Sequence, residues 1–199
     1  MYFTSYSDTT ATIAEDVVNT LNVVRNVEKM PDAETLQRFL VDHGVQPAKI
    51  PTARDLAEFR KLRPVLRSVF AAEREEEAVA TLNGMLTAHK AVPHYTDHDG
   101  QPWHLHVSRP DAPPVDQLAA NAAMGLLAAI STAGLHRLHT CVGNRCAEVF
   151  VDVSRNQSRH YCSPLICGNR ATAAAHRARA RAKGRPGSAD SPEESTKDR

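Results

Sequence analysis

Four cysteines, all in the last third of the chain, are the residues whose type and spacing point most directly to chemistry. They form two close pairs, Cys141-x4-Cys146 and Cys162-x4-Cys167, separated by fifteen residues. Each pair can supply two thiolates from one turn, and two pairs complete the tetrahedral shell of a zinc ion. Four thiolates leave no position for water or substrate, so we expect one structural zinc ion rather than a catalytic one.

Two disulfides are the alternative use of the four cysteines. The first residues, Met1–Ser7, lack the basic start and apolar run of a secretory signal peptide. Thiols stay reduced in the cytosol, so we expect a cytoplasmic protein with metal-bound thiolates. No apolar run approaches the roughly 20 residues of a membrane span, and no membrane segment is expected.

The segment around the cysteines resembles a known zinc finger. It contains Cys141-Val-Gly-Asn-Arg-Cys146, then Phe150-Val-Asp152-Val-Ser154-Arg155-Asn156, and finally Cys162-Ser-Pro-Leu-Ile-Cys167-Gly168-Asn169-Arg170. This pattern is similar to the CGNR zinc finger, which closes a bacterial family of stress-induced transcription regulators with an N-terminal helical ABATE domain. Two places depart from it, because His160-Tyr161 stands where Arg-Trp is usual and Ala171-Thr172 replaces a frequent basic residue. The resemblance implies a DNA-binding transcription regulator.

Shorter motifs upstream resemble the ABATE domain. They are Asp16-Val-Val-Asn19-Thr20-Leu21, Leu62-Arg63-Pro-Val-Leu66-Arg67, Leu82-Asn83 and Trp103. The resemblance suggests that Asn19, Arg63, Arg67 and Trp103 line a pocket for an acidic small-molecule effector, through which the helical domain would sense a stress signal. The alternatives are ordinary surface ion pairs for the two arginines and a core position for Trp103.

Charge is distributed unevenly along the chain. The whole sequence has a formal net charge of only +1. Residues 136–187 carry ten Lys/Arg against two Asp/Glu, which is +8, whereas residues 1–135 carry 12 basic and 17 acidic residues, which is −5. A basic module on a mildly acidic body indicates that one end of the molecule meets a polyanion.

The basic module continues into a helical run after Cys167. With 3.6 residues per turn, Arg170, Arg177 and Arg181 fall within roughly 40° of one another. The predicted nucleic-acid surface consists of these three with Arg155 and Arg159. The alternatives are a solvated helix without a partner and a zinc-stapled protein–protein interaction module. A single finger binds DNA weakly, so a homodimer or further contacts would be needed.

Hydrophobic periodicity predicts a mainly α N-terminal domain. One helix should start at Thr10 and continue through Ile13, Val17, Leu21 and Val24. Asp32 should cap a second helix that ends before Gly44, with Leu36, Phe39 and Leu40 facing the core. Thr52 should cap a third helix, which Pro64 should kink or split. Further helices are expected from the acidic stretch at 73–77 and over Val115–Ala133, closed by Gly134.

Two β-hairpins are expected. Residues 91–108 should form one, with a turn near Asp99-Gly100 and with His104 and His106 on one face. In the zinc module, Val149–Val153 should be a strand that pairs with Arg159–Cys162, before a helix that starts at Cys167. A treble-clef-like or ribbon-like knuckle would result.

The predicted organisation is therefore an ABATE-like helical domain over 1–135, a zinc finger with a basic helix over 136–183 and a tail of disordered composition over 184–199. The five histidines His89, His94, His98, His104 and His106 invite a second metal site, but no acidic or cysteine partner follows at a ligand spacing. The chain contains no phosphate-binding glycine loop, no H-E-x-x-H motif and no cysteine beyond the four, so we do not expect an enzyme.

Overall fold

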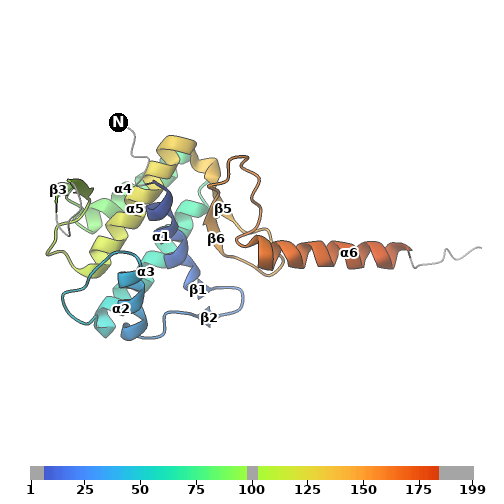
Figure 1. The fold of residues 1–199 in the computed structure, drawn as a ribbon, viewed down its shortest axis with the longest axis horizontal. Coiled ribbons are helices and arrows are strands. Elements are labelled where there is room, and N and C mark those ends of the chain that lie inside the picture. Colours follow the sequence, from blue (N-terminus) through green and yellow to red (C-terminus); the bar gives the residue numbers. More distant parts are fainter. Residues whose placement is uncertain (1–6, 98–102, 184–199) are drawn as a thin grey trace, which may run out of the picture.

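The computed structural model describes residues 7–97 and 103–183, and helices dominate this part of the chain (Figure 1). The helices are α1 (Ser7–Asn19), α2 (Ala33–Asp42), α3 (Ala53–Phe70), α4 (Glu75–Ala88), α5 (Pro114–Ala133) and α6 (Asn169–Lys183). Three two-stranded antiparallel sheets accompany them: β1 (Leu21–Asn22) with β2 (Val27–Glu28), β3 (His94–Thr96) with β4 (His104–His106), and β5 (Leu138–Thr140) with β6 (Val149–Val151). The mainly α fold class is confirmed.

The core forms around α5, which α1, α2, α3 and α4 all contact. α5 buries alanines and leucines on most of its circumference, because its sequence is apolar nearly all round. Gly125 lets α1 cross closely, since a Cβ at this position would lie 2.4 Å from the Thr10 carbonyl carbon. α1 and α5 therefore form the closest helix pair of the domain.

The predicted caps of the second and third helices are confirmed. Asp32 accepts a hydrogen bond from the Thr35 amide at the start of α2, and Leu36 and Leu40 are buried. Thr52 and Asp55 form a reciprocal capping box at the start of α3. α3 runs unbroken through Pro64, so the expectation of a split helix is wrong.

The first helix ends earlier than the periodicity predicts. α1 stops at Asn19, Leu21 lies in β1 instead, and Val24 is exposed in the turn between β1 and β2. A polar turn competes with the helix here: the Asn22 side chain accepts a hydrogen bond from the Arg25 amide, and Asn26 has a positive φ of 52°. This small hairpin carries Arg25 toward the zinc finger.

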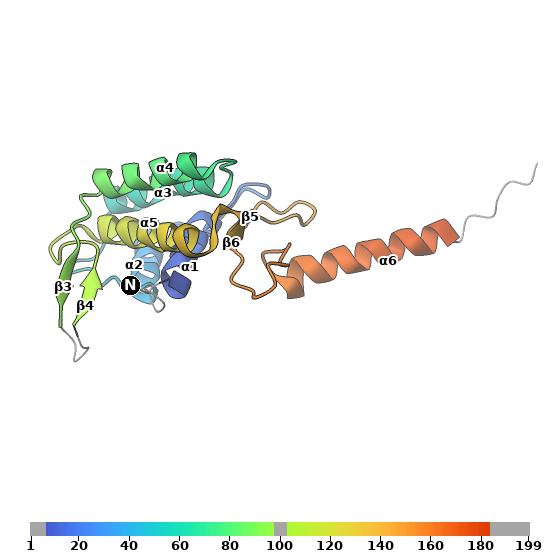
Figure 2. The ribbon, with the colours of Figure 1, turned by 90° about the horizontal axis from the view of Figure 1, so that it is seen from above.

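The hairpin over 91–108 is confirmed, with His94 opposite His106 and Thr96 opposite His104. Its predicted turn at Asp99-Gly100 lies outside the described residues. Trp103, just before β4, is 67% exposed and so is not a core residue. Figures 1 and 2 place this hairpin at the end of the molecule opposite the zinc finger.

The zinc finger consists of the β5–β6 hairpin, a single π-helical turn η2 (Pro164–Gly168) and α6. The prediction that residues 159–162 pair with the strand at 149–153 is wrong, because β5 takes that place: Leu138 lies opposite Val151. Cys167 lies in η2, and α6 starts two residues later than predicted, at Asn169. α6 projects away from the rest of the molecule (Figure 2).

Within the described ranges, none of the helices combines the length and the apolar character that crossing a membrane requires.

Candidate zinc centre and nucleic-acid interface

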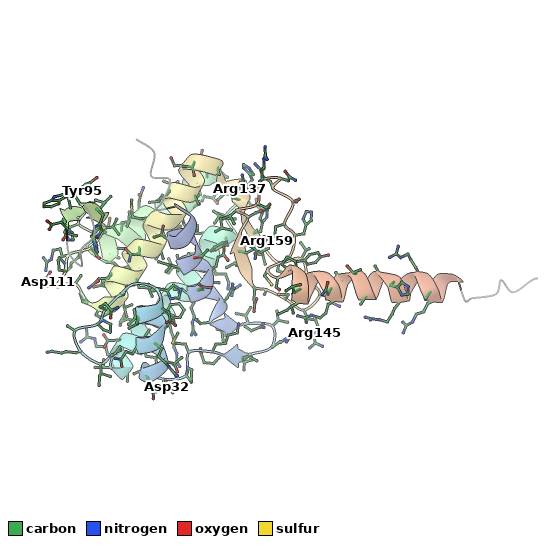
Figure 3. All side chains as sticks on the ribbon, viewed as in Figure 1. Asp32, Tyr95, Asp111, Arg137, Arg145 and Arg159 are labelled. Carbon is green, nitrogen blue, oxygen red and sulfur yellow. The ribbon has the colours of Figure 1, made fainter. Side chains whose placement is uncertain are left out.

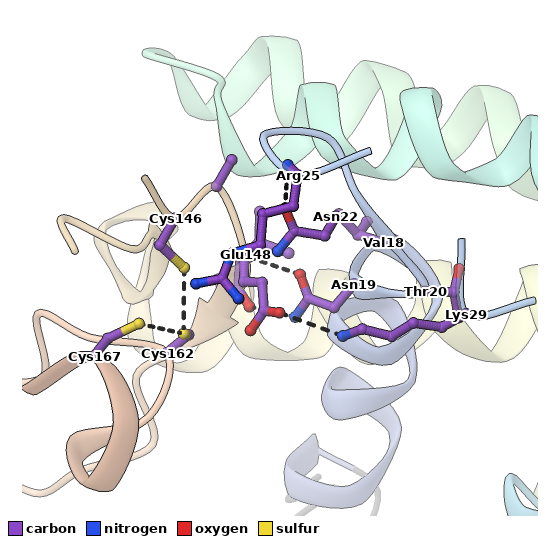
Figure 4. Close-up of polar contacts among 12 residues, drawn as sticks. Val18, Asn19, Thr20, Asn22, Arg25, Lys29, Cys146, Glu148, Cys162 and Cys167 are labelled. Atoms are coloured by element: carbon purple, nitrogen blue, oxygen red, sulfur yellow. Dashed lines mark hydrogen bonds and ion pairs between the residues drawn. The ribbon is translucent and has the colours of Figure 1, made fainter. Parts of the chain in front are cut away.

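The four cysteine sulfurs gather at one point and form the site of one zinc ion. The Sγ atoms of Cys141, Cys146, Cys162 and Cys167 all lie within 4.8 Å of one another. Cys162 Sγ lies 3.7 Å from Cys146 Sγ and 3.7 Å from Cys167 Sγ (Figure 4). Tetrahedral zinc with bonds of about 2.3 Å requires sulfur separations of about 3.8 Å, whereas a disulfide requires about 2.0 Å. All four cysteines are unpaired, so the disulfide alternative is wrong.

The electrostatics of the cluster require a cation. Burial and the neighbouring thiols raise the pKa of Cys162, and burial likewise raises that of Cys146, whereas at Cys141 burial is outweighed by hydrogen bonds from the backbone and the neighbouring thiols, which lower its pKa. Thiols gathered so closely stay protonated unless a positive charge stabilises the thiolates. A divalent zinc ion supplies that charge, and its binding releases the protons. The chemistry of the site therefore fits zinc.

The knuckle between the first two cysteines needs a small residue. The Gly143 amide lies 3.4 Å from Cys141 Sγ, as a weak N–H···S bond. A Cβ on Gly143 would lie 3.2 Å from Cys167 Sγ and 3.3 Å from Cys141 Sγ, a contact that the metal-held sulfurs could not relieve. Arg145 follows in the left-handed region with a φ of 56°, which turns the chain back toward Cys146.

Asp152 and Arg159 hold the loop between β6 and the second cysteine pair. Asp152 is buried and accepts hydrogen bonds from the amides of Ser154 and Arg159. The Arg159 guanidinium lies over the Phe150 ring at 4.5 Å and donates to the Tyr161 and Cys162 carbonyls. The Asp152 and Phe150 positions of the CGNR-like motif are therefore structural. Arg159 points into the finger, not toward a nucleic acid.

The finger docks on the helical domain through β6. The Asn19 side-chain amide donates to the Val149 carbonyl at 2.8 Å, and its oxygen accepts from the Val149 amide at 2.9 Å. Arg67 donates to the Ala147 carbonyl at 2.6 Å. Hydrophobic packing joins the two parts as well, since Val149 and Val151 are buried in the main core. The helical domain thus holds the strand beside the zinc knuckle.

Two acidic residues flank this docking contact. Glu15 on α1 accepts a hydrogen bond from the Val151 amide at 2.5 Å, and burial raises its pKa to about 7. Glu148, just before β6, forms a salt bridge with Lys29 at 3.3 Å (Figure 4). Sequence reasoning did not find Glu15, because one glutamate in a helical pattern gives no signal of a distant main-chain partner.

The residues expected to line an effector pocket do not meet around one cavity. Arg63 is buried and donates to Thr20 and, through both terminal nitrogens, to Glu28 at 2.8 and 2.7 Å. Asn19 and Arg67 bind the finger main chain, and Trp103 lies near the distant hairpin. Arg63 and Arg67 do not form ordinary surface ion pairs either. They connect the helical domain to its small hairpin and to the finger.

The predicted basic surface is mostly exposed. Arg177 and Arg181 are exposed on α6, and so is Arg155 on the finger loop. Arg170 is exposed too, but its Nη2 lies 3.6 Å from Cys167 Sγ. Figure 3 shows Arg145 near the start of α6 and Arg159 beside the body of the finger. Four of the five predicted residues therefore lie on the surface, and Arg159 does not.

Among described residues, only the four-cysteine cluster has the geometry of a metal site. His104 and His106 do lie on one face of the distant hairpin, with their Nε2 atoms 2.9 Å apart. Within the described ranges these histidines do not belong to a group of three metal ligands, and His98 lies outside the described residues.

Two protein families match the chain. The model of the ABATE family, described as "Putative stress-induced transcription regulator", matches residues 11–133. The model of the CGNR zinc finger matches residues 137–180. No curated protein sequence matches the chain.

Proposed function

Because this chain belongs to the ABATE family and carries a CGNR zinc finger, we propose that it is a zinc-containing transcription regulator that binds DNA. The single observation that carries the proposal is α6. From Thr172 to Arg181 every residue of this helix is exposed, and its long side chains are basic. A helix without an apolar face gains little from packing on its own protein. Phosphates offer it a partner, and its alanines permit close approach.

The zinc ion has a structural role in this proposal, and the protein is not an enzyme. Four thiolates fill the tetrahedral shell and fix the start of α6 relative to the knuckle. Reduced, metal-bound thiolates suit the reducing cytoplasm. One finger covers few base pairs, so a specific site would require a second copy of the chain or contacts from the helical domain.

The helical domain is proposed to receive a small-molecule or stress signal. An open groove lined by Asp16, Asn19, Met30 and Phe39 lies beside α1 and α2. Asn19 also holds Val149 of the finger. A ligand in the groove would touch a residue that positions the DNA-binding module.

A protein-binding module is the second candidate function. Val142, Leu165 and Ile166 are exposed on the finger at 67%, 80% and 59%. An apolar protein partner would cover these side chains, and its binding would depend little on salt.

The proposal is tested by binding of the zinc-loaded protein to genomic duplex DNA fragments across a salt series. DNA binding predicts that log affinity falls steeply and linearly with log salt. The matched control is the Cys162→Ser/Cys167→Ser variant, which should lose both zinc and binding. Absence of binding at low salt by the zinc-loaded protein would rule out the DNA function and leave the protein partner.

A further inference from the structure

We propose that the helical domain itself contacts the DNA backbone, through Arg25 in the β1–β2 turn together with Arg145 in the zinc knuckle. This inference rests on the proposed DNA function. It names the residue through which the helical domain supplies a further contact, beside a predicted surface whose residues all lie in the finger and α6.

Arg25 and Arg145 face a cleft between the two parts of the chain. The cleft measures about 230 Å³ and lies between the β1–β2 hairpin and the zinc centre (Figure 4). Its charged lining residues are Arg25, Lys29, Arg145, Glu148 and Arg170. Lys29 and Glu148 neutralise each other at 3.3 Å. Three guanidinium groups then remain, without an acidic partner in the lining.

The positive charge of Arg25 is not neutralised within the β1–β2 hairpin, because the acid of this hairpin, Glu28, pairs with arginines of α3. The two terminal nitrogens of the buried Arg63 donate to the two carboxylate oxygens of Glu28 in β2, and Arg60 Nε lies 3.7 Å from one of them, Oε2. These contacts turn the Glu28 carboxylate toward α3. Arg25 lies three residues before Glu28 and therefore carries its charge unopposed by the nearest acid of its own hairpin.

Compensation of the zinc thiolates is the competing explanation for these arginines. Two positive charges on zinc do not cancel four thiolates, so nearby guanidinium groups are attracted to the sulfurs. Arg170 supplies one positive charge to the thiolates, with Nη2 3.6 Å from Cys167 Sγ. For the guanidinium groups of Arg25 and Arg145, by contrast, the described part of the chain provides neither a hydrogen bond nor an ion pair, and both residues are exposed. They are available to a ligand.

Arg170 connects the cleft to α6. It lines the cleft, and it also lines the groove between the knuckle and α6, together with Arg177. The resulting arginine track consists of Arg25, Arg145, Arg170, Arg177 and Arg181. Its α6 portion, from 170 to 181, spans about 16 Å, or about five base-pair steps of duplex DNA. An occupant that spans both the cleft and the helix must be an extended polyanion, and guanidinium forks match phosphate oxygens.

The test removes the two charges that face the cleft, Arg25 in the helical domain and Arg145 in the zinc knuckle. The variant is Arg25→Gln/Arg145→Asn, because Asn tolerates the positive φ of 56° at position 145. Arg38→Gln/Arg54→Gln is the matched control, since both of these arginines are exposed on the helical domain outside the track. Each protein is titrated with the same duplex DNA across a salt series after zinc content and helicity are verified.

We expect the track variant to bind at least about tenfold more weakly near 0.1 M salt and to flatten the log–log salt slope by about 1.8, which is two phosphate contacts. Arg25→Lys/Arg145→Lys should retain the slope, and the control should match the parent protein. An unchanged slope in the track variant, with a flattened slope in Arg177→Ala/Arg181→Ala, would overturn the inference and leave the proposed function standing. Failure of the parent protein itself to bind duplex DNA would overturn both.

Discussion

The side chain of Asn19 satisfies both main-chain groups of Val149, at 2.8 Å to its carbonyl and 2.9 Å to its amide. A side-chain amide thus takes the place that a neighbouring strand would occupy beside β6. The contact joins the end of α1 to the strand that leaves the zinc knuckle, 130 residues later. Asn19 of the Asp-x-x-Asn-Thr motif is therefore a docking residue of this fold.

Replacement of Asn19 by Ala should loosen the finger from the helical domain. Two partly buried main-chain groups lose their partner, which costs about 1–3 kcal/mol of unfolding free energy. Hydrogen exchange at the Val149 amide should accelerate while zinc content stays unchanged. Asn83→Ala, at an exposed position of α4, is the matched control. Unaltered exchange at Val149 would show that docking depends on the hydrophobic contacts alone.

The stability of the docked state should depend on Glu15. Burial raises the folded-state pKa of Glu15 to about 7, from an ordinary value of 4.5, although the Val151 amide and Arg159 oppose the shift. Between these two pH values the folded protein binds more protons than the unfolded chain does. This contribution to stability is complete below pH 4.5, decreases as pH rises and is lost above about 7.

Glu15→Gln retains an acceptor for the Val151 amide and removes the titration. The unfolding free energy of the variant minus that of the parent should rise by about 1–3 kcal/mol between pH 5 and pH 8. Urea unfolding of the zinc-loaded pair at both pH values measures this difference, and the pH dependence of zinc binding cancels in it. A difference that stays constant, or falls, with pH would contradict the buried, protonated state of Glu15.

Removal of zinc should weaken the helical domain as well as unfold the finger. Leu138, Val149 and Val151 are buried in the main core, so unfolding of β5 and β6 exposes apolar surface of α1 and α3. Chelation should lower the thermal midpoint of the helical domain by about 10 °C. Circular dichroism at 222 nm with and without chelator provides the measurement. A midpoint that does not move would show that the finger is an independent attachment.

The α6 helix should be only partly formed without its partner. An isolated helix of this length is marginal in water, and Arg177 and Arg181 repel each other at a spacing of four. Amides in residues 172–181 should exchange quickly in the free protein and at least about tenfold more slowly on duplex DNA. Strong protection in the free protein would show that α6 already has a packing partner, such as a second copy of the chain.

The zinc ligands could be predicted from the sequence because ligand chemistry restricts both residue type and spacing. The caps at Asp32 and Thr52 were predictable for a similar reason, since a helix start depends on a few neighbouring residues. Hydrophobic periodicity predicts the end of a helix less well. The apolar spacing continues through Leu21 and Val24, but a polar turn ends α1 before them.

Long-range pairing was the part that the sequence could not provide. Residues 138–140 have no strand signature of their own, and they pair with β6 because the first two zinc ligands bring the chain back on itself. Arg159 carries the same charge as Arg177, and its position over the Phe150 ring is what distinguishes it from the arginines of the proposed DNA surface. Glu15 and Asn19 likewise owe their roles to contacts with residues more than one hundred positions away in the sequence. Arg25 owes its proposed role to a cleft between two parts of the chain.

The salt dependence of duplex DNA binding by Arg177→Ala/Arg181→Ala, compared with the parent protein, tests the central claim most directly. Alanine favours the helix at least as well as arginine, so a loss of binding would report lost charge and not a broken α6. We expect unchanged zinc content and a log–log slope that is flatter by about two units. A variant that keeps both the affinity and the slope of the parent would contradict the claim and assign α6 to a protein partner.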